Sequence, residues 1–136
     1  MTKATPTIQK YMTAMPVTVR PDLSLSVADK LMHDHGIRHL PVLNGGQLVG
    51  LVSQRDVRLI ETLKDVDPKV VTVEEAMSQD IYEITPDTTL EEVAANMAEH
   101  KYGSAVVVDH GKVVGIFTTV DAMKALVDIL HGRHRH

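Results

Sequence analysis

Two short stretches of the chain place a hydroxyl residue three positions before an aspartate, directly after an apolar run. GLVSQRD holds Ser53 and Asp56, and GIFTTVD holds Thr118 and Asp121. In each stretch a strand is expected to end at the hydroxyl residue, where a helix begins. The first turn of a helix exposes unpaired N–H groups and a partial positive charge, which favour an anion such as phosphate. The aspartate, one turn further on, can accept hydrogen bonds from the two hydroxyls of a ribose.

The same spacing also has a purely structural explanation. A hydroxyl residue followed three positions later by an acidic residue resembles a capping box, in which the two side chains satisfy the first N–H groups of the helix. A duplicated helix would need a duplicated cap, so repetition does not decide between a cap and a nucleotide site. Both interpretations stay open, and they can coexist if the cap loosens when a phosphate arrives.

The two stretches belong to a longer internal repeat. The offset that relates Ser53 to Thr118 also aligns the segments beginning at Thr7 and Thr72, without a gap, as far as Ile60 and Ala125. Among the identical pairs are Met12 and Met77, Pro21 and Pro86, Asp22 and Asp87, His35 and His100, and Gly50 and Gly115. Two copies of this length indicate a pseudo-twofold pair that shares a core, and not a solenoid.

Hydrophobic periodicity and turn residues predict the same elements in both copies. The first copy should hold a strand at 16–22, a helix at 25–35 between Ser24 and Gly36, strands at 39–43 and 47–53 joined by NGG, and a helix at 55–63. The second should hold a strand at 81–85, a helix at 89–100, strands at 104–109 and 110–118, and a helix at 120–130. TVEE at 72–75 predicts a further capping box. The predicted fold is α/β (α+β), with two β-α-β-β-α repeats at 7–64 and 72–130, followed by a disordered His/Arg tail at 131–136.

Composition excludes several classes of protein. The 136 residues include no Cys, only 3% aromatic residues and a formal net charge of -4, so disulfides, thiol chemistry and nucleic-acid binding are not expected. There is no apolar run long enough for a signal peptide or a membrane span, which predicts a cytoplasmic protein without membrane association. No nucleophile elbow, phosphate-binding loop or metal-ligand spacing is visible, so no catalytic residue and no metal site are expected.

The order and duplication of these segments resemble a tandem pair of CBS (cystathionine-β-synthase) domains, also called a Bateman module. The resemblance covers about residues 7–130. It rests on IQKYM and VEEAM, on VTVRPDLSL and YEITPDTTL, and on the blocks GIRHLPVLNGGQLVGLVSQRD and YGSAVVVDHGKVVGIFTTVD. Members of this family usually bind adenosine-containing ligands, so the resemblance implies a non-enzymatic regulatory module for AMP, ADP, ATP or S-adenosylmethionine, with no required cofactor.

The resemblance also implies two sites in clefts between the repeats. In the first, Asp56 would hold the ribose, while phosphate would face Ser53, Arg55, Arg38 and His39 and the base would lie beside Ile81, Tyr82 and Glu83. In the second, Asp121 would hold the ribose, with Thr118 and Ser104 toward phosphate and Met15, Pro16, Val17 and Thr18 as the crossing segment. The adenine slots would be lined by Ile37, Pro41 and Tyr102.

The copies differ in charge around the phosphate position. The first copy carries Arg38, His39 and Arg55 where the second has Gly103, Ser104 and Val120. Because arginine makes charge-assisted bonds to phosphate, the Asp56 site is expected to take the more highly charged ligand. The alternative is that the two arginines form an ordinary solvated surface pair.

The second helix of each copy has more apolar residues than a single buried stripe requires, which predicts a homodimer through these helices. Burial of a long apolar helix inside the monomer is the alternative. An unidentified protein target would sense the ligand. The competing function is a constitutive dimeric scaffold whose clefts are vestigial.

Overall fold

A computed structural model describes residues 5–134, and its elements divide between two parts of the chain. We call Pro16–Ile81 the central unit. The N-terminal segment up to Met15 and the chain from Tyr82 onward together form the terminal unit. Each unit has its own cluster of buried hydrophobic side chains, whereas the repeat predicted a single shared core.

The central unit is built on a hairpin of β2 (His39–Asn44) and β3 (Gln47–Ser53). The strands pair from His39 opposite Ser53 to Asn44 opposite Gln47. Gly45 and Gly46 adopt positive φ in the connecting turn, which residues with a Cβ rarely do. Isolated bridges extend the hairpin on both edges, with Val19 beside Val42 and Ser78 beside Leu51.

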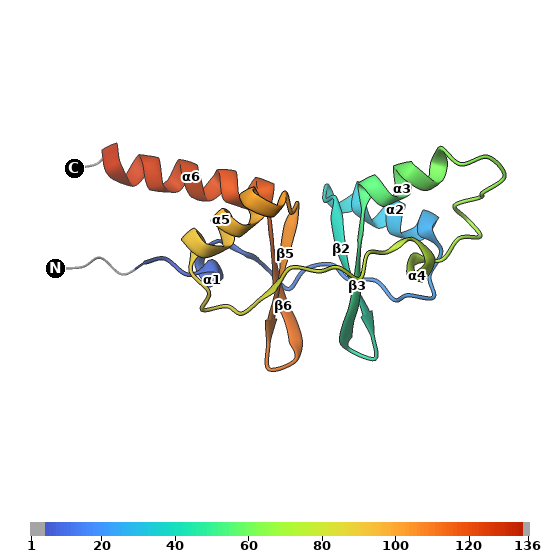
Figure 1. The fold of residues 1–136 in the computed structure, drawn as a ribbon, viewed down its shortest axis with the longest axis horizontal. Helices are drawn as coiled ribbons and strands as arrows, with labels where there is room; N and C mark the ends of the chain where they lie inside the picture. Colours follow the sequence, from blue (N-terminus) through green and yellow to red (C-terminus); the bar gives the residue numbers. More distant parts are fainter. Residues whose placement is uncertain (1–4, 135–136) are drawn as a thin grey trace. The chain divides into compact units, whose positions relative to one another are not determined.

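Three helices of the central unit lie to one side of this hairpin (Figure 1). They are α2 (Leu25–His35), α3 (Gln54–Glu61) and α4 (Val73–Ala76). The Ser24 hydroxyl accepts a hydrogen bond from the Val27 amide at the start of α2, and Gly36 ends that helix in the left-handed conformation.

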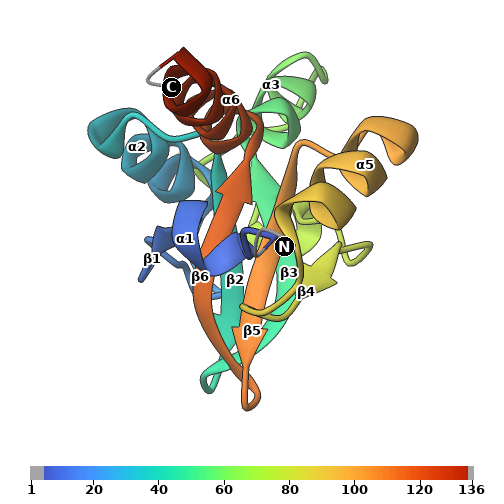
Figure 2. The same ribbon diagram turned by 90° about the vertical axis from the view of Figure 1, so that its left-hand side faces the viewer.

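The terminal unit repeats this plan with a more complete sheet, ordered β1-β6-β5-β4. β5 (Ser104–Asp109) and β6 (Lys112–Thr118) form its hairpin, β1 (Thr13–Ala14) pairs antiparallel with β6, and β4 (Glu83–Ile84) pairs parallel with β5. The helices are α1 (Ile8–Tyr11), α5 (Leu90–His100) and α6 (Thr119–His134). Figure 2 shows α5 and α6 at the end of the hairpin opposite its turn.

The opening segment of each sequence repeat packs in the unit that the other repeat builds. Ile8 of α1 is fully buried in the core of the terminal unit, and its amide donates to the Thr88 carbonyl at 2.8 Å. Val73 of α4 is fully buried in the core of the central unit, where its amide donates to the Leu23 carbonyl at 2.8 Å. Since each core needs this segment, the two sequence repeats are not the same as the two compact units.

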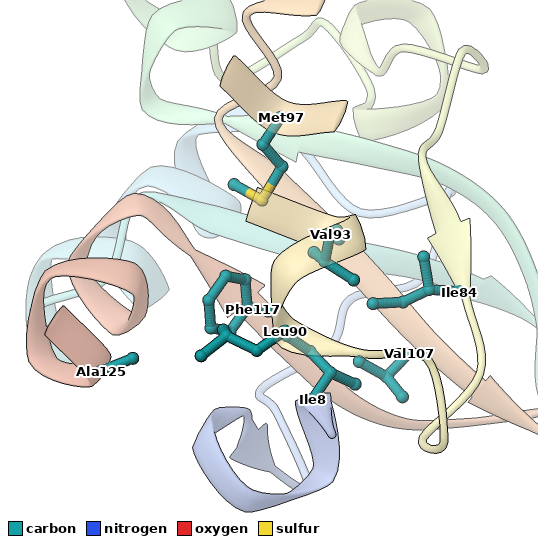
Figure 3. Close-up of a cluster of buried hydrophobic side chains, with 9 residues drawn as sticks. Ile8, Ile84, Leu90, Val93, Met97, Val107, Phe117 and Ala125 are labelled. Carbon is teal, nitrogen blue, oxygen red and sulfur yellow. The ribbon is translucent and has the colours of Figure 1, made fainter. Parts of the chain in front are cut away.

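Among the described residues, Phe117 is the one aromatic side chain that is fully buried in either core. Around Phe117 of the terminal unit pack the buried side chains of Ile8, Ile84, Leu90, Val93, Met97, Ala105, Val107 and Ala125 (Figure 3). At the position that matches Phe117, the central unit has Val52, which is also fully buried. The low aromatic content of the chain is therefore visible as two small cores filled mainly by branched aliphatic residues.

The predicted α+β fold and the order of elements are confirmed, with differences at several ends. The strand predicted at 16–22 is reduced to a single bridge at Val19, because Pro16 and Pro21 have no N–H to donate to a ladder. The helix predicted at 55–63 runs from Gln54 to Glu61. A disordered tail was predicted from residue 131, but α6 continues to His134; residues 135 and 136 lie outside the described part of the chain.

Candidate ligand-binding sites

The junction between β3 and α3 holds Ser53 and Asp56 in a capping box. The Ser53 amide and hydroxyl both donate to Oδ2 of Asp56, at 2.8 and 3.0 Å, and the Asp56 amide donates to the Ser53 hydroxyl at 3.2 Å. The capping interpretation of this motif is thus confirmed. Oδ1 of Asp56 accepts no hydrogen bond among the residues that the structure describes, and the side chain is only half-buried.

The junction between β6 and α6 repeats the same bonds with Thr118 and Asp121. The Thr118 amide and hydroxyl donate to Oδ2 of Asp121 at 3.0 and 3.2 Å, and the Asp121 amide donates to the Thr118 hydroxyl at 3.4 Å. Asp121 is nevertheless buried, with 7% of its surface exposed. The two aspartates therefore share a backbone setting and differ in accessibility.

Thr13 of β1, which lies outside the predicted site residues, bonds to Asp121 in the terminal unit. Its hydroxyl donates to Oδ1 of Asp121 at 3.2 Å and lies 3.4 Å from Oδ2. The matching residue of the central unit is Ser78, whose hydroxyl instead accepts a hydrogen bond from the Asp80 amide at 3.2 Å. The available signal was a hydroxyl residue directly after the repeated methionine, in Met12–Thr13 and again in Met77–Ser78.

The predicted phosphate-facing residues of the central unit lie around the start of α3. The Gln54 amide donates to the Arg38 carbonyl at 2.9 Å, and His39 lies opposite Ser53 in the hairpin. Arg38 and Arg55 are exposed, and His39 is half-buried. Burial lowers the pKa of His39; the Asp56 carboxylate opposes that shift and Arg38 adds to it. The geometry brings two cations and a titratable imidazole to the start of the helix that carries Asp56.

The terminal unit has the same framework without those charges. The Thr119 amide donates to the Gly103 carbonyl at 3.3 Å, and Ser104 lies opposite Thr118 in the hairpin. Ser104 is buried, and Val120 stands exposed at the position that matches Arg55. The difference in charge that the sequence predicted therefore falls on matching positions of two equivalent junctions.

The apolar residues predicted to line the sites fall into both units. In the central unit, Ile37 and Val17 pack against the core, Pro41 is buried in β2 opposite Leu51, and Pro16, Thr18 and Ile81 are half-buried. Tyr82, predicted to lie beside the base of the first site, and Tyr102, predicted to line an adenine slot, both belong to the terminal unit. Their ring centroids lie 5.1 Å apart, and Tyr102 also stacks on His100 at 5.3 Å. The Asn96 amide donates to the Tyr82 hydroxyl at 3.0 Å, so both rings take part in one aromatic cluster.

Residues 5–134 offer no metal site and no membrane-spanning helix. No group of three or more His, Asp or Glu in that range is arranged to hold a metal ion. In the same part of the chain, no helix combines the length and the apolar character that crossing a bilayer requires.

Comparison with known families assigns the fold. The model of the CBS domain matches the chain twice, over residues 8–60 and 67–128. The chain belongs to the CBS domain family. The resemblance to a tandem pair of CBS domains is therefore confirmed.

Relatives of this CBS pair include a longer enzyme and solved CBS pairs of similar length. Inosine-5'-monophosphate dehydrogenase of Korarchaeum cryptofilum is 33% identical over 122 residues, which are 89% of this chain and 24% of the enzyme. The CBS domain pair of protein MJ0100, in complex with 5'-methylthioadenosine and S-adenosyl-L-methionine, is 25% identical with a TM-score of 0.83, over 92% of this chain and 98% of that one. CBSX2 in complex with AMP is 26% identical with a TM-score of 0.81, over 91% and 98% of the two chains.

Proposed function

We propose that this CBS pair is a regulatory module that binds adenosine-containing ligands, with the ribose held by Asp56 in one site and by Asp121 in the other. The observation that carries the proposal is the repeated junction, where a carboxylate lies in the first turn of a helix that begins directly after a hairpin strand. Two solved CBS pairs of similar length hold AMP, or 5'-methylthioadenosine and S-adenosyl-L-methionine. Those ligands share adenine and ribose and differ in charge.

The central unit is the proposed site for phosphorylated ligands. Arg38, Arg55 and His39 offer N–H donors and positive charge near Asp56, and the terminal unit has no such group at the matching positions. We assign AMP, ADP or ATP to the Asp56 site, and we expect a phosphate to add no affinity at the Asp121 site, which lacks these groups. Ligand binding would shift the module between two conformations, and a protein target would bind one of them. The ligand can cause this shift only if its affinity differs between the two conformations.

Calorimetry with AMP, ADP, ATP, S-adenosylmethionine and adenosine tests the proposal, together with thermal unfolding in the presence of each compound. At least one compound should stabilise the protein in a saturable way. Asp56→Ala and Asp121→Ala should each remove part of the binding. If no compound binds, a constitutive scaffold with vestigial sites explains the protein instead.

A pair of matched variants tests the assignment of charge. Arg55→Val and Val120→Arg give each unit the residue that the other has at that position. Arg55→Val should weaken AMP binding by about tenfold, because one charge-assisted hydrogen bond contributes about that much to binding. Adenosine binding should stay unchanged. Gain of an arginine at position 120 should raise the preference of the terminal unit for AMP over adenosine. An equal effect of both variants on AMP and adenosine would contradict the assignment.

We also propose that the module forms a homodimer through α6. Apolar side chains on this helix are exposed at helical spacing, with 60% of Met123 and 50% of Val127 accessible; the others are Val120, Leu126, Ile129 and Leu130. α3 adds the exposed Leu59 and Leu63. In sedimentation velocity, Val127→Lys should convert a dimer into a monomer, whereas Glu99→Lys on the exposed face of α5 should not. A monomeric parent protein would reject this proposal.

A further inference from the structure

Resting on the proposed function, we propose that Thr13 is the residue that makes the two ribose sites unequal, so that a nucleoside fills the Asp56 site before the Asp121 site. Thr13 lies outside both motifs that define the sites. It reaches Asp121 from β1, a strand of the terminal unit that is far from α6 in the sequence.

The argument starts from the acceptor positions of a carboxylate. Each oxygen offers about two lone-pair directions. In both units Oδ2 is taken by the amide and hydroxyl of the capping residue, so a ribose must use Oδ1 if the cap is to remain. Oδ1 of Asp56 accepts no hydrogen bond from the described residues, so both of its lone-pair directions are available to the hydroxyls of a ribose.

In the terminal unit the Thr13 hydroxyl already occupies Oδ1 of Asp121, at 3.2 Å. Two ribose hydroxyls can be accepted there only after Thr13 gives up its bond. Within the described residues, Ser78 at the matching position of the central unit makes no hydrogen bond to Asp56; its hydroxyl accepts one from the Asp80 amide. A ribose hydroxyl would replace the Thr13 bond by another hydroxyl–carboxylate bond, so the net change in the dissociation constant is expected to be only about two- to tenfold.

A second consequence separates this role from a merely structural one. Thr13→Val keeps the shape of the side chain and removes the hydroxyl, which leaves one oxygen of a buried carboxylate without its donor. The free protein should therefore become less stable, while the variant binds a ribose more tightly, because the ligand now supplies the missing donor. A general loosening of the site would lower stability and affinity together.

The experiment follows adenosine binding to the full chain by amide NMR, with residues 53–57 and 118–122 as separate reporters of the two sites. Adenosine is used because it carries no phosphate, so the arginines of the central unit do not bias the comparison. In the parent protein the amides of 53–57 should saturate first. In Thr13→Val the dissociation constant reported by 118–122 should fall by about two- to tenfold. The constant reported by 53–57 should stay unchanged.

Three controls complete the design. Thr13→Ser keeps the hydroxyl and should behave as the parent, and Ser78→Ala should leave both sites unchanged. With 2',3'-dideoxyadenosine, which lacks the ribose hydroxyls, Thr13→Val should make no difference. If adenosine binds but Thr13→Val leaves the 118–122 site unchanged or weakens it, the role of Thr13 is wrong and the proposed function stands. If neither adenosine nor AMP shifts any amide, both fail.

Discussion

The two junctions, Ser53–Asp56 and Thr118–Asp121, are alike in their backbone and unlike in their side chains. Both aspartates close a capping box, and both helices begin beside the same point of a hairpin. Yet Asp56 is half-buried among Arg38, His39 and Arg55, whereas Asp121 is buried and bonded to Thr13. The cap fixes where each helix starts, which leaves the residues around it free to diverge without loss of the fold. Equal scaffolds therefore do not imply equal sites.

The largest expected difference between the units lies in their cores. Phe117→Ala should lower the free energy of unfolding by about 3–5 kcal/mol, because a fully buried ring leaves a large cavity. Val52→Ala, at the matching position, removes fewer atoms and should cost only about 1.5–3 kcal/mol. Chemical denaturation followed by far-ultraviolet circular dichroism measures both. If both substitutions lowered the free energy of unfolding equally, the size of the removed side chain would not explain the loss.

In each unit a glycine packs closely against a methionine, and replacing that glycine should cost the same stability in both units. A Cβ added at Gly50 would lie 2.3 Å from Sδ of Met77, and one added at Gly115 would lie 2.4 Å from Sδ of Met12. Gly50→Ala and Gly115→Ala should each cost about 1–3 kcal/mol through overpacking. The thioether is flexible, so each loss is expected to be partly relieved when the facing methionine is changed to alanine. A double-mutant cycle in each unit measures this coupling, and coupling in only one unit would break the equivalence.

The ends of the matching helices α2 and α5 should respond in opposite directions. Gly36 and Lys101 both adopt the left-handed conformation, with φ of 63° and 59°, and only the glycine does so without strain. Lys101→Gly should therefore raise the free energy of unfolding by about 1 kcal/mol, and Gly36→Ala should lower it by a similar amount. The melting temperature of each variant should shift in the same direction. A Cβ added at Gly36 would meet no atom within 4 Å, so the cost of Gly36→Ala comes only from the backbone conformation. A destabilised Lys101→Gly protein would contradict this explanation.

The smallest effect concerns pH and only the central unit, since Ser104 replaces His39 in the other. Burial lowers the pKa of His39 in the folded protein, so the unfolded chain binds more protons below about pH 6.5. Stability should fall as the pH drops from about 6.5 to the lowered pKa and then level off. Comparison of urea denaturation for the parent protein and His39→Gln isolates this slope. No difference between the two slopes would mean that His39 titrates as it does when unfolded.

A bound phosphate should reverse that pH effect, because a negative charge beside His39 favours the imidazolium form. AMP should then bind more tightly at pH 6 than at pH 8, with proton uptake measurable by calorimetry in buffers of different ionisation enthalpy. Adenosine binding to the same protein serves as the control, and it should show no such dependence.

Residues close in the sequence determined much of this protein. The helix at 25–35 between Ser24 and Gly36, and the strand at 47–53, follow from local spacing, caps and turn residues, and the structure confirms them. The internal repeat of the sequence predicted the two equivalent junctions. These features could be predicted because each depends on residues within a few positions of one another.

Tertiary structure decided what brings distant residues together. Ile8 and Val73 complete cores that other parts of the chain build, and the Thr13 hydroxyl meets Asp121 across β1 and β6. Whether an aspartate in the same motif is buried or accessible depends on such partners, since a carboxylate can be buried only where donors from elsewhere replace water. The motif fixed the position of each carboxylate, and the packing of remote segments fixed which of its oxygens is free.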